Sequence, residues 1–148
     1  MDHEFFMQEA LRLARLAGQE GEVPVGAVVA RGSEVLGRGY NSPVSRNDPT
    51  AHAEILALRE AAAALGNYRL EDATLYATLE PCPMCAGALV AARVQRLVFG
   101  ARDLRFGAVR SKFTLADSDL LNHRVEILEG VFAVECAALL QDFFRRRR

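Results

Sequence analysis

Any fold of this chain has to account for two short stretches that contain its obvious metal-ligand chemistry. The first, PTAHAEIL, contains His52 and, two residues later, Glu54. The second, EPCPMCAG, contains Cys82 and Cys85, each close after a proline. Imidazole nitrogen and cysteine thiolate are donors that zinc prefers in proteins. If both stretches serve one site, the fold must bring together segments that lie far apart in the chain.

The number of ligands separates a catalytic site from a structural one. One His and two Cys leave a tetrahedral zinc one protein ligand short, which is typical of catalytic zinc. We therefore expect His52, Cys82 and Cys85 to hold one zinc ion per chain. A structural site would need a fourth ligand, and three other residues could supply it: Cys136, His3 and His123. Cys136 lies within an amphipathic pattern, where a small buried thiol is the ordinary interpretation, and we expect none of the three to complete the site.

Glu54 has both a catalytic and a structural interpretation. On a helix it would point about 200° around the axis from His52, so it is poorly placed to bind the same metal. In the first turn it can instead lean over a metal-bound water, whose pKa zinc lowers to near 7, and take its proton. The alternative is an acidic residue favoured by the helix dipole, worth up to about 1 kcal/mol. The nearby cysteines favour the catalytic interpretation.

Length and composition favour a single domain over residues 1–148. The chain has 148 residues, enough to bury a core without disulfides. No apolar run approaches the roughly 20 residues of a membrane helix, and the start, MDHEFFMQEAL, is acidic and amphipathic, unlike a signal peptide. We therefore expect a cytoplasmic protein without membrane association.

Three cysteines, two of them closely spaced, suit reduced metal-binding thiols. A redox C-x-x-C is the alternative, but it would leave His52 and Glu54 without a role.

The apolar pattern alternates between helix and strand periods. Helical patterns cover residues 3–17, 51–65, 84–92 and 131–146, strand patterns cover residues 23–30, 34–41, 73–79, 96–100 and 124–130, and residues 41–49 resemble a loop. This order indicates an α/β fold with three layers, α/β/α, around a mixed five-stranded sheet. The segment between Gly100 and Arg124 is too long for a tight hairpin and long enough for a crossover, so we expect the last two strands to be parallel.

This topology also predicts where the ligands meet. Both ligand stretches lie at the start of a predicted helix, and in such sheets these junctions fall at the carboxyl edge of the strands. Cys82 and Cys85 are three residues apart, so on one helical turn their sulfurs face the same way. A helix start also favours the thiolate, which is the form that binds metal.

The basic residues are unevenly distributed although the net charge is only −1. All but one of the 18 basic residues are arginine, the side chain best suited to forked phosphate contacts. They are concentrated between Arg93 and Lys112 and in the RRRR at residues 145–148. An arginine bias can also come from genome composition, and a charged tail is often only solvated. The charges alone are therefore weak support for a nucleic-acid partner.

The two metal-ligand stretches match the H-x-E…P-C-x-x-C signature of zinc-dependent nucleobase deaminases. Nearly the whole chain, through VPVGAV, YNSP, DPTAHAEI, NYRLEDATLYATLEPCPMCAGA, VFGARD, NHRVEI and ECAALLQDFFRRRR, resembles the bacterial tRNA-specific adenosine deaminases of the cytidine deaminase-like superfamily. The resemblance implies hydrolysis of adenosine to inosine at the wobble position of a tRNA anticodon. It also implies a homodimer that binds the anticodon stem-loop.

The resemblance assigns roles to individual residues. It implies zinc ligands at His52, Cys82 and Cys85, and it implies that Glu54 moves a proton from water to N1 of the ring and then helps ammonia leave. It implies six further substrate contacts: Asn41 and Val25 at the target base, Asp103 and Asn122 at neighbouring nucleotides, and Phe144 and Arg147 at the anticodon stem-loop.

Several of these positions also have ordinary structural interpretations. Asn41 could be a turn residue at a strand end, Asp103 could pair with a neighbouring arginine, and Phe144 could be part of the core. The chain departs from the family pattern after Asp103, in LRFGAVRSK, where Phe106 and Arg110 could stack on or pair with RNA, or could change how the loop sits.

Two other functions remain open. A deaminase of a free base or nucleoside (cytidine, cytosine or guanine) would share the zinc site. The predicted parallel final strands and the basic segments count against it, because only RNA binding gains from a series of phosphate contacts. A non-enzymatic, zinc-stabilised binding module would need a fourth protein ligand and would leave Glu54 without a role.

Overall fold

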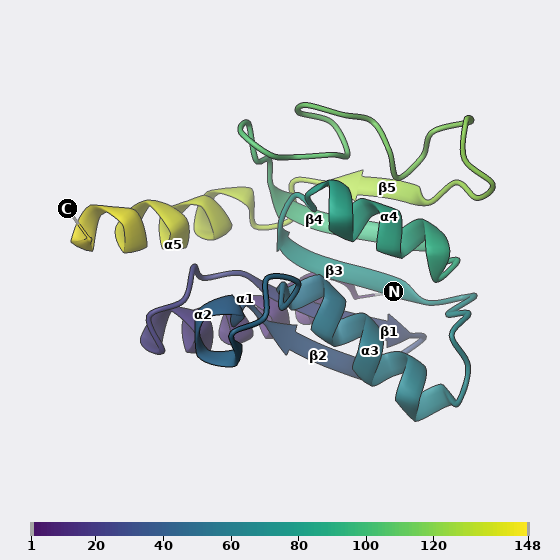
Figure 1. The fold of residues 1–148 in the computed structure, drawn as a ribbon, viewed down its shortest axis with the longest axis horizontal. Coiled ribbons are helices and arrows are strands. Elements are labelled where there is room, and N and C mark those ends of the chain that lie inside the picture. The colour runs from purple at the N-terminus through teal and green to yellow at the C-terminus, as the bar shows by residue number, and fades with distance from the viewer. Residues whose placement is uncertain (1, 148) are drawn as a thin grey trace.

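The computed structural model describes residues 2–147, in which a five-stranded sheet lies between two layers of helices (Figure 1). The elements follow in the order α1 (His3–Gln19), β1 (Gly26–Arg31), β2 (Glu34–Tyr40), α2 (Pro43–Arg46), α3 (Ala53–Leu65), β3 (Thr74–Leu79), α4 (Pro83–Ala91), β4 (Arg96–Ala101), β5 (Glu126–Glu129) and α5 (Ala133–Arg146). The strand order is β2-β1-β3-β4-β5. β1 is antiparallel to β2 and β3, whereas β4 is parallel to β3 and β5. The predicted mixed sheet with a parallel final pair is confirmed.

Alternate residues of the central strands face opposite helical layers, as the two-residue period of a strand requires. Ala27 and Val29 of β1 belong to the core cluster that includes α3 and α4. Val28 and Ala30 belong to the cluster that includes α1 and Cys136 of α5. All four β1 residues are fully buried. Because both faces of the sheet are covered, the strand is a continuous apolar run rather than an alternating one.

α3 lies close against β2 because two residues of that strand have no side chain. A Cβ at Gly37 would collide with the backbone carbonyl of Ala57, and one at Gly39 with that of Ala53. The helix ends at Gly66, which adopts the left-handed conformation with φ 65° that is usual for a helix-ending glycine. This close packing fixes the start of α3, and with it the position of the first ligand stretch.

One connecting segment differs in detail from expectation. Residues 41–49, predicted to be a loop, contain the one-turn helix α2, which begins at Pro43. The buried Glu22 carboxylate accepts hydrogen bonds from the backbone N–H of Val44 (3.2 Å) and of Ser45 (2.7 Å) in this turn. The crossover from β4 to β5, residues 102–125, contains neither helix nor strand and forms the extended loops above the sheet in Figure 1. Among residues 2–147, no helix has the length and apolar character needed to cross a membrane.

Candidate active site

The first ligand of each stretch is the residue directly before a helix. His52 precedes α3 and Cys82 precedes α4, and both have extended backbone, with ψ of 151° and 175°. Glu54 and Cys85 lie in the first turns of the two helices. The prediction that His52 lies on the same helix as Glu54 is therefore wrong, because His52 is the N-cap of α3. The angular argument for separating the two side chains does not apply, although Glu54 is in the first turn as expected.

The three predicted ligands form one cluster. Nδ1 of His52 lies 3.5 Å from Sγ of Cys82 and 3.5 Å from Sγ of Cys85, and all three ligand atoms lie within 4.8 Å of one another. Typical Zn–S and Zn–N bonds of about 2.3 and 2.0–2.1 Å at tetrahedral angles give an N···S separation of about 3.5 Å. The observed separations therefore fit three corners of a tetrahedral zinc site.

A fourth ligand is not present in the part of the chain that the structure describes, where the cluster consists of these three residues alone. Cys136 is buried in the core on the opposite face of the sheet. Nδ1 of His3 lies 2.8 Å from the Tyr76 hydroxyl, and Nε2 of His123 lies 2.8 Å from the carbonyl oxygen of Val94. The arrangement has the ligand number of a catalytic zinc site rather than a structural one.

The sulfur and imidazole groups influence one another's protonation. A hydrogen bond from Cys85 lowers the pKa of Cys82 to about 4, and the same interaction, together with burial, raises the pKa of Cys85. A hydrogen bond with Cys82 raises the pKa of His52. One thiolate is thus stabilised by its two neighbours. A divalent cation among the three would favour both thiolates and the neutral imidazole.

Glu54 is buried beside this cluster, with 4% of its surface exposed. Burial raises its pKa to about 7. A carboxyl group with this pKa can both accept and release a proton near neutral pH, which is the property required of a general acid–base group.

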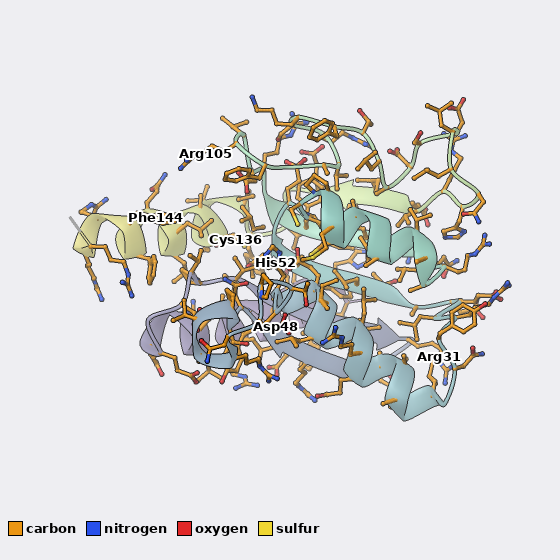
Figure 2. All side chains as sticks on the ribbon, viewed as in Figure 1. Arg31, Asp48, His52, Arg105, Cys136 and Phe144 are labelled. Atoms are coloured by element: carbon orange, nitrogen blue, oxygen red, sulfur yellow. The ribbon has the colours of Figure 1, made fainter. Side chains whose placement is uncertain are left out.

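A pocket of about 760 Å³ opens next to the cluster. Its walls come from many parts of the chain: Val23, Val25, Asn41, His52, Glu54, Leu79, Glu80, Cys82, Pro83, Arg102, Asp103, Leu104, Arg105, Phe106, Leu140 and Phe144. Four of the six predicted substrate contacts are among them, namely Val25, Asn41, Asp103 and Phe144. In the view of Figure 2, Phe144 and Arg105 lie on one side of His52, whereas Arg31 lies on the other.

The other two predicted contacts lie away from this pocket in the single chain. Asn122 is exposed in the crossover, and its carbonyl oxygen accepts a hydrogen bond from Arg93 (2.9 Å). Arg93 follows the C-terminal end of α4, whereas Cys82 precedes the start of that helix. Arg147 donates a hydrogen bond to the carbonyl oxygen of Gly21 (2.7 Å), and its guanidinium lies 4.5 Å from the ring centre of Phe143. Arg147 lines a separate cavity between α1 and α5.

In the segment after Asp103, the structure contradicts the pairing of Asp103 with a neighbouring arginine. The Asp103 carboxylate accepts hydrogen bonds from the backbone N–H of Arg105 (3.1 Å) and Phe106 (3.2 Å) rather than pairing with an arginine side chain. Phe106 lines the pocket, but Arg110 forms an ion pair with Asp117 (3.0 Å) and is not a pocket residue.

The sequence analysis missed Glu80, which also lines the pocket. Its only signal in the sequence is an acidic residue at the end of an apolar strand.

Comparison with known proteins places this site in a family. Residues 1–148 match the MafB19-like deaminase family. A tRNA-specific adenosine deaminase of Haemophilus influenzae is 49% identical over 146 residues, which is 98% of this chain and 84% of that protein. The chain belongs to the family of tRNA-specific adenosine deaminases. Another member of this family, from Bacillus subtilis, is 46% identical over 145 residues, 98% of this chain and 90% of that protein.

Solved structures agree with membership in the tRNA-specific adenosine deaminase family. A structure from work on A-to-I editing by tRNA:A34 deaminases at the wobble position of transfer RNA has a TM-score of 0.89 and 44% identity, covering 92% of this chain and 99% of that one. A guanine deaminase from Nitrosomonas europaea has a TM-score of 0.83 and 28% identity, covering 95% and 83%. The predicted family is confirmed, and because the fold is shared with a guanine deaminase, the fold alone does not select the base.

Proposed function

We propose that this protein hydrolyses adenosine to inosine at the wobble position of a tRNA anticodon. The observation that carries the proposal is the three-ligand cluster with the buried Glu54 beside it, at a pocket large enough for a nucleobase. Membership of the tRNA-specific adenosine deaminase family supports RNA as the substrate. The basic segments supply positive charge for phosphate contacts.

One zinc ion per chain is the proposed cofactor, held by His52, Cys82 and Cys85. The separations of their ligand atoms support this choice, as does the His-Cys-Cys donor set, which zinc favours. When bound, zinc supplies a Lewis acid that makes water a good nucleophile near neutral pH.

Glu54 carries the protons in the proposed reaction. Its carboxylate accepts a proton from the attacking water and delivers it to N1 of adenine while the oxygen bonds to C6. It then moves the second proton from the new hydroxyl to the exocyclic amine, whose bond to C6 breaks and releases ammonia. Its pKa near 7 allows it to serve as base and then as acid.

The proposed substrate contacts follow the pocket. A base flipped out of the anticodon loop would pack against Val25 and His52, and the Asn41 side chain offers both a donor and an acceptor to its edge. Asp103 and Phe144 also line the pocket, and we expect them to contact the neighbouring nucleotides. Contacts of Asn122 and Arg147 with RNA remain predictions for parts of the surface beyond this pocket.

A cytoplasmic homodimer of single-domain chains is the proposed form of the protein. An apolar groove between α3 and α4 offers a surface for a second copy; it is lined by Ile55, Leu58, Arg59, Ala62, Tyr68, Leu70, Ala88, Ala91 and Ala92. Light scattering should give twice the chain mass of 16.2 kDa. A mass of one chain at micromolar concentration would contradict the dimer.

The proposed activity is tested with purified, zinc-loaded protein and four substrates. These are an anticodon stem-loop with adenosine at the wobble position, free adenosine, free cytidine and free guanine. We expect inosine from the stem-loop and little product from the free compounds. Rapid deamination of a free base or nucleoside, with no inosine in the stem-loop, would instead identify a small-molecule deaminase.

A further inference from the structure

Glu80 is a buried carboxylate at the end of β3, two residues before Cys82, and 2% of its surface is exposed. Its two oxygens accept five hydrogen bonds from the segment 103–111. Oε1 accepts from the backbone N–H of Asp103 (3.0 Å) and the hydroxyl of Ser111 (2.5 Å), and Oε2 accepts from the backbone N–H of Val109 (3.0 Å), Arg110 (2.7 Å) and Ser111 (2.9 Å). Four of the five partners are backbone N–H groups, which can only donate, so both oxygens of the carboxylate act as acceptors.

The segment 103–111 closes tightly around this carboxylate. A Cβ at Gly107 would collide with the Glu80 carboxyl group, so only glycine fits there without a shift. The backbone N–H of Ala108 donates to the carbonyl oxygen of Pro81 (2.8 Å), and that of Glu80 donates to Ala101 (2.8 Å). The short stretch that carries Cys82 is therefore attached directly to the segment that forms another wall of the pocket.

The side chains at the start of this segment are not held by a core. Leu104 and Phe106 line the pocket although 73% and 59% of their surfaces are exposed. The Arg105 guanidinium lies 5.5 Å from the ring centre of Phe106. Aromatic rings and guanidinium groups are the side chains on which unpaired bases stack. Residues 103–111 contain neither helix nor strand. Apart from the buried Ala108 and Val109 and a few backbone hydrogen bonds, the hydrogen bonds to Glu80 hold this segment in place.

We propose that Glu80 is a positioning residue for the RNA substrate. Glu80 holds residues 103–111 in place as a pocket wall, so that the nucleotides beside the target base have a fixed binding surface. The inference rests on the proposed function. Glu80 acts through Asp103 and Phe106 and not on the reacting atoms, because its own oxygens are already occupied. Its loss should therefore weaken binding of the stem-loop much more than it slows the chemical step.

The first test is independent of activity and uses Glu80→Gln in the zinc-loaded protein. The amide keeps the shape of the side chain but replaces one acceptor oxygen with a donor that faces backbone N–H groups. Hydrogen exchange of the Val109, Arg110 and Ser111 amides should become about tenfold faster, while amides in β1 remain unchanged. Unchanged exchange in the segment 103–111 would overturn the proposed attachment.

The second test measures deamination of the anticodon stem-loop. Glu80→Gln should raise KM about tenfold and change kcat by less than about threefold, with zinc still at one per chain. Ser111→Ala, which removes one of the five hydrogen bonds and leaves Glu80 in place, should raise KM in the same direction by less, and it provides the test if Glu80→Gln does not fold. Glu34→Gln, at the exposed start of β2, should change neither constant.

The outcomes separate the two proposals. Faster exchange with an unchanged KM, or a loss confined to kcat, would overturn the positioning role while the proposed function stands. Absence of inosine with the wild-type protein would refute the proposed function, and with it any role in RNA binding. The exchange measurement would still decide whether Glu80 holds the segment.

Discussion

Two buried carboxyl groups line one pocket, and their surroundings shift their pKa values in opposite directions. Burial raises the pKa of Glu54 to about 7. Burial also works against ionisation of Glu80, but hydrogen bonds from Ser111 and the backbone of Arg110 outweigh it and leave its pKa below the usual value. Hydrogen bonds to a carboxylate favour its charged form, whereas burial with few such bonds favours the neutral form. The same side chain thus suits proton transfer at position 54 and backbone attachment at position 80.

At the scale of single residues, the proton-transfer role predicts the effect of Glu54→Gln. The amide fills the same buried space but cannot carry a proton, so kcat on the stem-loop should fall by about 10²–10⁴. Zinc content should stay at one per chain because Glu54 is not among the ligands. Glu34→Gln, in the exposed hairpin, should leave kcat unchanged. Turnover retained in Glu54→Gln would show that another group moves the proton.

The sequence predicted that His52, Cys82 and Cys85 would come together, although they lie 30 and 33 residues apart, because their residue types indicate one shared site. His52 and the two cysteines sit in stretches whose spacing and residue types already indicate zinc. Glu80 could not be predicted in the same way, since four of its five hydrogen-bond donors are backbone N–H groups of an irregular segment, which residue type does not reveal. The positions of Asn122 and Arg147 outside the pocket also depend on tertiary contacts that residue type does not reveal.

At the scale of elements, the strands and long helices were predictable because period and capping residues are local signals. Gly66, for example, ends α3 where the pattern of small and apolar residues stops. The helix α2 was missed because Asn-Ser-Pro indicates a loop, and the carboxylate that supports the turn comes from the distant Glu22. The length of the crossover predicted the parallel pairing of β4 with β5, but it did not predict the path of the crossover itself.

Glu9 of α1 pairs with Arg38 of β2, and we expect this pairing to make the stability of the fold depend on acid. Hydrogen bonds from Arg12 (2.6 Å) and Arg38 (2.9 Å) lower its pKa from its ordinary 4.5 to about 2. A lowered folded-state pKa stabilises the protein above pH 4.5, and this contribution disappears as the pH falls toward 2. After allowance for solvent screening, Glu9→Gln should cost about 1 kcal/mol of unfolding free energy at pH 7.

Denaturant unfolding of the wild type and Glu9→Gln at pH 7 and near pH 2 checks this expectation. The difference between the two proteins should shrink toward zero at the lower pH. A difference that is the same at both pH values would show that the ion pairs of Glu9 do not stabilise the fold.

The basic end of α5 predicts a salt effect on RNA binding. Arg145 pairs with Asp142 on the exposed surface, and residue 148 lies outside the described residues. Replacing residues 145–148 with glutamine should weaken stem-loop binding and reduce the slope of log K against log salt by about 0.7–0.9 for each phosphate that the tail no longer neutralises. Arg31→Gln, in the hairpin on the other side of the molecule (Figure 2), serves as the control. An unchanged slope in the tail variant would mean that the tail is only solvated.

At the scale of the whole molecule, the site is assembled where several elements end. The starts of α3 and α4 bring His52 and Cys82 together at the carboxyl edge of β3, and α5 supplies Phe144 from the other helical layer. Ligands in such sheets bind outside the carboxyl ends of the strands. The pocket therefore depends on the complete three-layer fold rather than on one motif.

Zinc held between α3 and α4 should stabilise the entire fold. Zinc at about 1,000 times its dissociation constant adds about 4 kcal/mol, so its removal by a chelator should lower the thermal midpoint by about 10 °C. In Cys82→Ala the midpoint should already be lower and should no longer respond to the chelator. An equal response of both proteins would show that the chelator acts elsewhere.

The most direct measurement is a map of inosine along a full-length tRNA after incubation with the zinc-loaded protein, because it tests the site, the pocket and the substrate together. We predict inosine at the wobble adenosine alone, with no conversion in Glu54→Gln. Inosine at other adenosines of the tRNA, or an unmodified wobble position beside rapid deamination of a free base, would contradict the account.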